Sequence, residues 1–276
     1  MLISILEDDF MNQEIKEIIS LLKKAGNEVL KIYRKEYRIF QKEDKTLLTE
    51  ADLISEKIIL EGLRKYNYGI LSEEKRDYFP FLSKEKIWVI DPLDGTEDFL
   101  QKTGDFSIMV GLIDQEEPVL GVVYLPAREK IYWAEKKNGA YLKENNNPLK
   151  KLRVSRVTNL KDSRFVVSRF HLDEATKKFM KENKIRKIET RGSIGLKLGL
   201  IAEGKADAYL TFSNKTYQWD TCAPEIILKE AGGKITDLKG KSLLYQTKEL
   251  KNLNGIVASN GILHNKLINL YREFNI

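Results

Sequence analysis

The chain opens with apolar side chains at helical spacing. Over residues 12–36 these positions share one face, with lysine and glutamate opposite, which predicts an amphipathic helix. A second helix is expected after Thr49, whose side chain suits an N-cap. Residues 69–71 and the fully apolar run 87–90 have the length and composition of strands, and Pro92 is expected to end the second one.

Three segments then follow one another like antiparallel strands joined by turns: 106–113, 118–125 and 130–135. Asn138-Gly139 predicts a turn, and a second cluster of turn residues lies at 145–148. We therefore place a boundary between two lobes near this cluster. Residues 1–150 are expected to form an α+β lobe that carries most metal ligands, and residues 151–276 an α/β lobe.

The second lobe alternates short apolar runs with helical patterns. Gly204 and Gly232-Gly233 follow two of the helices, and glycine suits the left-handed cap of a helix end. The expected strands are 165–167, 208–210, 234–236 and 255–258, and the expected helices are 173–183, 194–203, 221–231 and 262–273. This alternation argues for a layered α/β or α+β protein.

The chain has 276 residues, enough for one large core or two fused lobes. Hydrophobic residues make up 42% and charged residues 32%, which indicates a soluble globular protein. No apolar run approaches the ~20 residues of a membrane helix, so no membrane partner is expected. Residues 1–10 lack the basic start of a signal peptide; we interpret them as a loosely held leader before Met11 and expect a cytoplasmic location.

The net charge of +6 comes from lysines spread along the whole chain. It suits an anionic substrate, although a solvated lysine-rich surface would explain it equally well. The lack of a basic block argues against a nucleic-acid polymer as partner. The one cysteine, Cys222, excludes an intrachain disulfide, and two histidines, His171 and His264, cannot build a zinc site without several carboxylates.

Carboxylates gather after the strand at 87–90. Asp91 ends the apolar run and Asp94 follows three residues later, so both can converge on one point beyond the strand. Oxygen ligands of this kind suit Mg²⁺, a hard cation. The backbone N–H groups of Gly95 and Thr96 can hold a phosphate oxygen, as exposed amides at helix starts do. Asp-Pro and Asp-Gly are also common turn pairs, so this stretch alone leaves a simple turn open.

Two further acidic clusters add to this pattern. Glu73-Glu74 follows the strand at 69–71, and adjacent glutamates repel each other unless they are solvated or bind a metal. Asp220 precedes the helix at 221–231, where an N-cap would lie. Taken singly, these clusters leave open a surface acidic pair and an ordinary helix cap.

Taken together, the clusters resemble the inositol monophosphatase superfamily, which includes bisphosphate nucleotidases and some fructose-1,6-bisphosphatases. The matching elements are Asp91 to Thr96 with Phe99 for its Asp-Pro-x-Asp-Gly-Thr pattern, Trp219-Asp220 with residues 230–233 for its Trp-Asp and Glu-Ala-Gly-Gly elements, Glu73-Glu74, and Ala51-Asp52. They cover nearly the whole chain in the expected order. The resemblance implies a layered α-β-α-β-α sandwich of two lobes, with the active site in the cleft between them.

The resemblance also implies roles for individual residues in a phosphomonoesterase. Two Mg²⁺ ions would be held by Glu73, Asp91, the Leu93 carbonyl, Asp94 and Asp220. Asp52, aided by Thr96, would serve a third and weaker ion, and Thr96 with Glu73 would orient the attacking water. Inhibition by Li⁺ is a further implication. The oligomeric state is left open, with a homodimer as one possibility.

Several segments resemble the bisphosphate nucleotidases more closely than the inositol phosphatases. The residues implied in substrate binding are Leu93, Asp94, Gly95, Thr96, Ser168, His171, Ser193, Lys197 and Asp220. Lys197 matches a lysine that holds the second phosphate of a nucleotide, although a solvated helix lysine is the plainer interpretation. The subfamily has an arginine where this chain has Thr211, and Lys215 in the following loop is a candidate replacement for that charge.

Three functions follow from the sequence. The first is a 3′(2′),5′-bisphosphate nucleotidase that removes the 3′-phosphate of adenosine 3′,5′-bisphosphate. The second is an inositol 1-phosphate or fructose 1,6-bisphosphate phosphatase on the same scaffold. The third is an inactive binding protein, which the complete set of carboxylates argues against.

Overall fold

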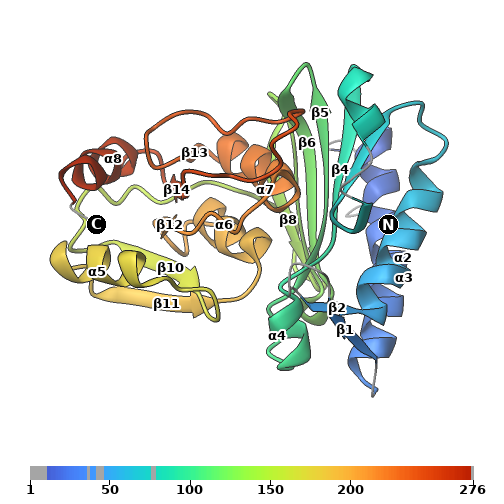
Figure 1. Ribbon diagram of the computed structural model, residues 1–276, viewed down its shortest axis with the longest axis horizontal. Helices are drawn as coiled ribbons and strands as arrows, with labels where there is room; N and C mark the ends of the chain where they lie inside the picture. Colours follow the sequence, from blue (N-terminus) through green and yellow to red (C-terminus); the bar gives the residue numbers. More distant parts are fainter. Residues whose placement is uncertain (1–10, 36–37, 42–46, 76–78, 275–276) are drawn as a thin grey trace.

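The computed structural model describes residues 11–35, 38–41, 47–75 and 79–274. The proposed leader, residues 1–10, therefore lies outside the described residues. The rest forms five layers, in which helices and two sheets alternate (Figure 1). This arrangement confirms the layered α-β-α-β-α sandwich expected from the sequence.

The first layer is a pair of helices, α2 (Gln13–Tyr33) and α3 (Glu50–Leu63), which pack on the outer face of the larger sheet. The Asn12 side chain caps α2 by accepting from the Ile15 N–H at 2.8 Å. Thr49 is the N-cap of α3, as predicted. Its N–H donates to the carboxylate of Asp52 at 2.7 Å, so the cap also fixes a candidate site residue. A short pair of strands, β1 (Ile39–Gln41) and β2 (Leu47–Thr49), joins the two helices.

The second layer is a seven-stranded sheet whose strands follow one another in chain order. Its strands are β3 (Gly69–Ser72), β4 (Lys86–Asp94), β5 (Ser107–Asp114), β6 (Glu117–Leu125), β7 (Lys130–Glu135), β8 (Gly139–Glu144) and β9 (Lys150–Lys151). Only β3 and β4 run parallel within this sheet; the other neighbours are antiparallel. The segments predicted at 106–113, 118–125 and 130–135 are confirmed as β5, β6 and β7.

One prediction in this sheet was wrong, because Pro92 does not end β4. The pairing of β4 with β5 shifts register between Asp91 and Asp94, and it resumes where Asp94 pairs with Ser107. Proline lacks an N–H and is tolerated at such an irregularity, where no ladder hydrogen bond is required from it. The two aspartates therefore belong to one strand, on either side of a bulge.

The third layer consists of α6 (Ile194–Ala202) and α7 (Gln218–Glu230), which lie between the two sheets (Figure 1). Their buried side chains share one core with residues of both sheets, including Tyr132 and Tyr209. Although α7 comes late in the chain, it packs on β4, β5, β6 and β7. It starts at Gln218, three residues before the predicted start of this helix.

The fourth layer is a five-stranded sheet in the order β11-β10-β12-β14-β13. Its strands are β10 (Arg164–Ser168), β11 (Lys187–Arg191), β12 (Ala208–Thr211), β13 (Lys234–Thr236) and β14 (Ile256–Ser259). The sequence did not indicate β11, because this edge strand is exposed and lacks an apolar alternation. The last layer, α5 (Glu174–Glu182) and α8 (His264–Glu273), covers the outer face of this sheet (Figure 1).

Short helical turns complete the chain: η1 (Glu73–Lys75), η2 (Phe79–Ser83), α4 (Thr96–Leu100) and η3 (Pro126–Arg128). Two of these, η1 and α4, directly follow the strand ends that carry candidate metal ligands. Within the described part of the chain, no helix has both the length and the apolar character required to cross a membrane.

Candidate active site

Three carboxylates meet at the end of β4. Asp91 and Asp94 come from the two sides of its bulge, and Asp220 comes from the first turn of α7. Each offers an oxygen atom that lies within 4.8 Å of those of the other two. Asp91 is only 1% exposed, although it carries a charge in its ionised form. The packing of α7 on β4 therefore joins ligands that are far apart in the sequence.

This cluster, defined by Asp91, Asp94 and Asp220, is strained electrostatically. Burial raises the pKa of Asp91 well above its usual range, and the charges of Glu73, Asp94 and Asp220 raise it further. The pKa of Asp220 is likewise raised by burial, then by Asp94 and Glu73. Asp91 Oδ2 is buried without a hydrogen-bond partner among the described residues. Carboxylates that repel one another, one of them with a buried oxygen that has no donor, fit a divalent cation such as Mg²⁺.

Asp220 does not occupy the N-cap position expected from the sequence. The N-cap of α7 is Tyr217, and Asp220 lies three residues later, where its carboxylate accepts from the Tyr217 N–H at 2.7 Å. An acidic residue in the first helical turn can bind the free amide of the N-cap residue. This contact uses one oxygen, Oδ2, and orients the carboxylate toward the end of β4.

Glu73 approaches the same point from β3. Because β3 and β4 run parallel with Ser72 beside Ile90, the next residues along the two chains, Glu73 and Asp91, lie at neighbouring positions. The charge of Glu73 raises the pKa of both Asp91 and Asp220. These effects indicate that Glu73 belongs with the carboxylate cluster, and they disfavour a solvated surface pair.

Asp52 and Thr96 lie side by side next to the cluster. The Thr96 hydroxyl donates to Asp52 Oδ1 at 3.4 Å and lies 3.3 Å from the Leu93 carbonyl oxygen. Burial raises the pKa of Asp52 to about 7, opposed by hydrogen bonds from Thr49 and reinforced by the charge of Glu73. The sequence-predicted residues Asp52, Leu93 and Thr96 are therefore brought together.

Gly95 is needed for this arrangement. Its φ of 90° lies in the left-handed region, and it precedes the first residue of α4. A Cβ atom there would lie 3.0 Å from the Asp105 carbonyl oxygen and 3.2 Å from the Ser193 nitrogen. Glycine alone therefore allows the chain to turn sharply between two backbones.

Ser193 links the second lobe to the carboxylates. It is the N-cap of α6, where its hydroxyl accepts from the Leu196 N–H at 3.0 Å. The same hydroxyl donates to Asp94 Oδ2 at 2.6 Å, and the Gly195 N–H donates to that oxygen at 3.1 Å. Ser193 is thus placed beside the carboxylate cluster, and its role in substrate binding stays a prediction.

Lys197 is not a solvated helix lysine. It is 3% exposed, its ammonium group donates to the Gly192 carbonyl oxygen, and it lies 5.4 Å from the centre of the Tyr209 ring. Burial lowers the pKa of Lys197 to about 8, while the nearby charges of Asp94 and Asp220 oppose the shift. A buried cation at this place is therefore close enough to the carboxylates to sense their charge.

Other predicted substrate residues lie toward the edge of the site. His171 is exposed at 56% of its side chain and lies 3.4 Å from Glu97. Thr211 is buried and its hydroxyl donates to Asp173 Oδ2 at 3.2 Å, so it belongs to the cap of α5. Lys215 is exposed, and Ser168 ends β10. Among the described residues, no hydrogen bond or ion pair joins these four to the carboxylate cluster.

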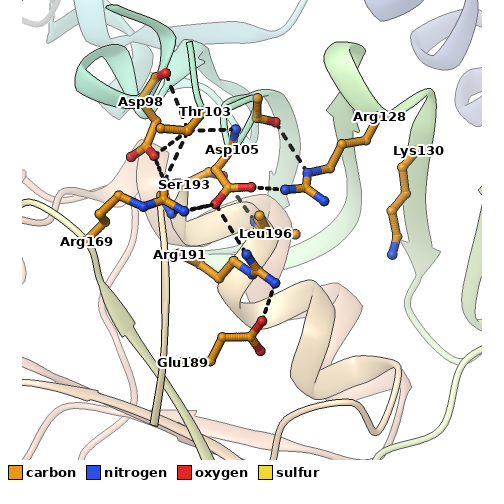
Figure 2. Close-up of polar contacts among 12 residues, drawn as sticks. Asp98, Thr103, Asp105, Arg128, Lys130, Arg169, Glu189, Arg191, Ser193 and Leu196 are labelled. Atoms are coloured by element: carbon orange, nitrogen blue, oxygen red, sulfur yellow. Dashed lines mark hydrogen bonds and ion pairs between the residues drawn. The ribbon is translucent and has the colours of Figure 1, made fainter. Parts of the chain in front are cut away.

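A second group of charged residues, for which no role was predicted, lies close by. Asp98 and Asp105 are buried and form ion pairs with arginines that converge from three segments: Arg128, Arg169 and Arg191 (Figure 2). The available signal was the adjacency of Asp105 to the start of β5 and of Arg169 to Ser168. Residue type alone did not show that these charges would be buried together.

Comparison with known proteins agrees with this geometry. The chain is 34% identical over 240 residues to the 3′(2′),5′-bisphosphate nucleotidase CysQ of Aggregatibacter actinomycetemcomitans, covering 85% of this chain and 88% of the relative. The structure of CysQ from Bacteroides thetaiotaomicron has a TM-score of 0.75 at 28% identity, covering 89% and 96% of the two chains. The IMPase of Thermotoga maritima has a TM-score of 0.80 at 28% identity, covering 95% and 98%.

The model of one protein family, the inositol monophosphatase family, also matches residues 11–275, nearly the whole chain. This family is metal-dependent, in line with the group of acidic residues that could bind a metal here. The chain therefore belongs to the inositol monophosphatase family and is a phosphoric monoester hydrolase.

Proposed function

We propose that this protein is a Mg²⁺-dependent 3′(2′),5′-bisphosphate nucleotidase that removes the 3′-phosphate of adenosine 3′,5′-bisphosphate. The observation that carries the proposal is the group of Asp91, Asp94 and Asp220 at the end of β4, in which Asp91 is buried, with the buried cation Lys197 nearby. The 34% identity to a CysQ nucleotidase supports this substrate class.

Two Mg²⁺ ions would be held by Glu73, Asp91, the Leu93 carbonyl, Asp94 and Asp220, with Asp52 at a third and weaker position. The unpartnered Asp91 Oδ2 and the all-oxygen donor set support this assignment. When bound, the ions would supply the positive charge that activates a water molecule and neutralises the leaving oxygen of an in-line displacement.

The chain's own residues would orient the reaction around this charge. Since the Thr96 hydroxyl donates its proton toward Asp52 Oδ1, its lone pairs are available to accept a hydrogen bond from the attacking water. The other oxygen of Asp52 is held by the N–H and hydroxyl of Thr49, which fixes this direction. Glu73 would accept the second hydrogen of the same water. The Gly95 and Thr96 amides would hold an oxygen of the scissile phosphate.

The rest of the substrate would lie against the residues that follow β10 and β11. An ammonium group has three donors, and Lys197 uses one on the Gly192 carbonyl, which leaves two for the second phosphate. Ser168, His171 and Ser193 would complete this binding surface. The two lobes, 1–150 and 151–276, would thus supply the metal ligands and the substrate contacts, with Asp220 as the ligand from the second lobe.

A phosphate-release panel tests the proposal. With Mg²⁺, adenosine 3′,5′-bisphosphate should have a higher kcat/KM than inositol 1-phosphate or fructose 1,6-bisphosphate. Lys197→Ala should lower kcat/KM for the bisphosphate by roughly ten- to a hundredfold, the equivalent of one charge-assisted hydrogen bond of ~1.5–3 kcal/mol. Lys205→Ala is the matched control, because this lysine follows the same helix but pairs with Glu203.

An inositol or sugar phosphatase is the second candidate. It is favoured by the TM-score of 0.80 to the Thermotoga maritima IMPase. Thr211 does not discriminate between the two, because it replaces both the arginine of the nucleotidases and the glutamate that inositol phosphatases often carry there. A higher kcat/KM for inositol 1-phosphate or fructose 1,6-bisphosphate would assign this function instead. An equal loss on all substrates in Lys197→Ala would also contradict the nucleotidase assignment.

A further inference from the structure

Two buried carboxylates lie beside the metal-site residues but outside the carboxylate cluster. Asp98 lies in α4 and Asp105 precedes β5, and their side chains are 5% and 0% exposed. Three arginines reach them: Arg128 from η3, Arg169 after β10 and Arg191 at the end of β11 (Figure 2). Buried carboxylates need such partners, because an unpaired charge in the interior is costly.

Arg169 spans both carboxylates (Figure 2). Its Nη1 contacts Asp98 and donates to the Thr103 hydroxyl at 3.1 Å, while its Nη2 donates to Asp105 Oδ2 at 2.5 Å. Its backbone N–H donates to the Arg191 carbonyl oxygen at 3.0 Å. One residue therefore ties the segment 98–105 to the ends of both β10 and β11.

The segments joined in this way are the two halves of the proposed site. On one side, residues 98–105 continue directly from Thr96 and the end of β4. On the other side, Arg169 is flanked by Ser168 and lies against Arg191, which leads into the loop of Ser193. Ser193 in turn donates to Asp94. Arg169 thus holds the substrate-facing loops against the proposed metal-binding end of β4. Its hydrogen bonds and ion pairs in the described part of the chain are to Asp98, Thr103, Asp105 and Arg191, none of which is a proposed metal ligand.

We propose that Arg169 is a positioning residue that fixes the spacing between the metal-binding carboxylates and the loops that hold the rest of the substrate. This inference rests on the proposed function and assigns a specificity role to a residue outside the reacting groups. The planar guanidinium binds two carboxylates at once, which the single ammonium of a lysine does not reproduce. Since a misplacement of about 1 Å can cost on the order of 10²-fold in rate, substrates that span both halves should depend on Arg169 most.

Arg169→Lys tests this role, because it keeps a positive charge beside the buried carboxylates and so protects folding. The matched control is Arg164→Lys, at the opposite end of β10, where Arg164 pairs with the buried Asp207. The substrates are adenosine 3′,5′-bisphosphate, which spans both halves, and p-nitrophenyl phosphate, which requires only the metal-binding half. Circular-dichroism melting of each variant gives its folded fraction.

We expect Arg169→Lys to raise KM for the bisphosphate by roughly tenfold or more, with kcat/KM for p-nitrophenyl phosphate within about twofold of wild type. Arg164→Lys should leave both substrates within about twofold. An equal fall in kcat on both substrates at unchanged KM would indicate only a loss of folded enzyme and would overturn the proposal. Unchanged kinetics on the bisphosphate would overturn it as well.

If the nucleotidase assignment itself is wrong, the wild-type protein will fail to hydrolyse the bisphosphate. This result is distinct from a failure of the positioning role, which only the variants test. In that case hydrogen–deuterium exchange tests the positioning role without a substrate. Arg169→Lys should speed amide exchange in both 96–105 and 166–171, whereas Arg164→Lys should leave residues 96–105 unchanged. Wild-type exchange in both segments of Arg169→Lys would refute the inference.

Discussion

The substitution Asp91→Asn separates the catalytic role of the carboxylate cluster from its cost to the fold. Two ionised carboxylates whose nearest oxygens lie within 4.8 Å of each other repel by at least about 3.5 kcal/mol at an effective dielectric constant of ~20, and Asp91 faces two such neighbours. Proton uptake by the cluster already relieves part of this repulsion, because the pKa values of Asp91 and Asp220 are raised. We therefore expect the metal-free variant to gain about 1–3 kcal/mol in free energy of unfolding.

The same change should remove a ligand and abolish turnover. Saturating Mg²⁺ at 100 times its dissociation constant should stabilise the wild type by about 2.7 kcal/mol, and Asp91→Asn should lose most of this gain. Urea unfolding in EDTA and in Mg²⁺ measures both effects, and phosphate release measures activity. Asp114→Asn, on neighbouring β5 and paired with Lys86 at 3.7 Å, is the control that should keep its activity and its Mg²⁺ response.

Two results would refute this reasoning. Retention of more than about a tenth of the wild-type rate, equivalent to under 1.4 kcal/mol of barrier, would show that Asp91 does not hold an essential ion. A metal-free variant less stable than the wild type would show that Asp91 makes a favourable contact that outweighs its repulsion from Asp94 and Asp220.

Three further predictions concern the metal and pH. Turnover should vanish in EDTA and return with Mg²⁺, while excess Ca²⁺ should inhibit through its looser coordination; full activity without metal would contradict the mechanism. Li⁺ at roughly tens of millimolar should inhibit by occupying an oxygen-lined cation position, and an unchanged rate would argue against this implication of the family resemblance. His264 is buried with a pKa lowered to about 4 by desolvation. Because His264 takes up a proton more readily in the unfolded state, the free energy of unfolding is highest above about pH 6.5 and falls as the pH drops toward 4. The loss should reach about 2 kcal/mol by pH 5. His264→Gln should remove that part of the pH dependence in urea unfolding, and an unaltered dependence would exclude His264 as its source.

The helices and most strands could be predicted because their apolar periodicity is local. Thr49 as an N-cap and the strands β5 to β7 follow from spacing alone. The continuation of β4 through Pro92 could not be predicted this way, because it depends on pairing with Ser107 in the next strand. The exposed edge strand β11 could not be predicted for a similar reason, because it is held as a strand by pairing with β10.

The candidate site likewise contains residues that could be predicted from the sequence and others that could not. Asp91, Asp94 and Asp220 were singled out because together they resemble the motifs of the inositol monophosphatase superfamily; their types and spacing alone left an ordinary turn and a helix cap open. The position of Asp220 within its helix was assigned incorrectly by three residues, since an acidic residue serves equally well as N-cap or in the first turn. The burial of Lys197 could not be predicted from the sequence, because Lys197 lies in α6 and the aromatic ring beside it, that of Tyr209, belongs to β12.

The placement of α7 has a consequence for how this enzyme type can diversify. Because α7 packs on β4 to β7, the carboxylates of Asp91, Asp94 and Asp220 are all anchored to the seven-stranded sheet, even though Asp220 comes late in the chain. The loops that follow β10 and β12 are attached to the other sheet. Substitutions at positions such as Thr211, the last residue of β12, can therefore accumulate without shifting these carboxylates. Substrate specificity can therefore change through substitutions on the second sheet, while the carboxylates proposed to support hydrolysis keep their positions on the first.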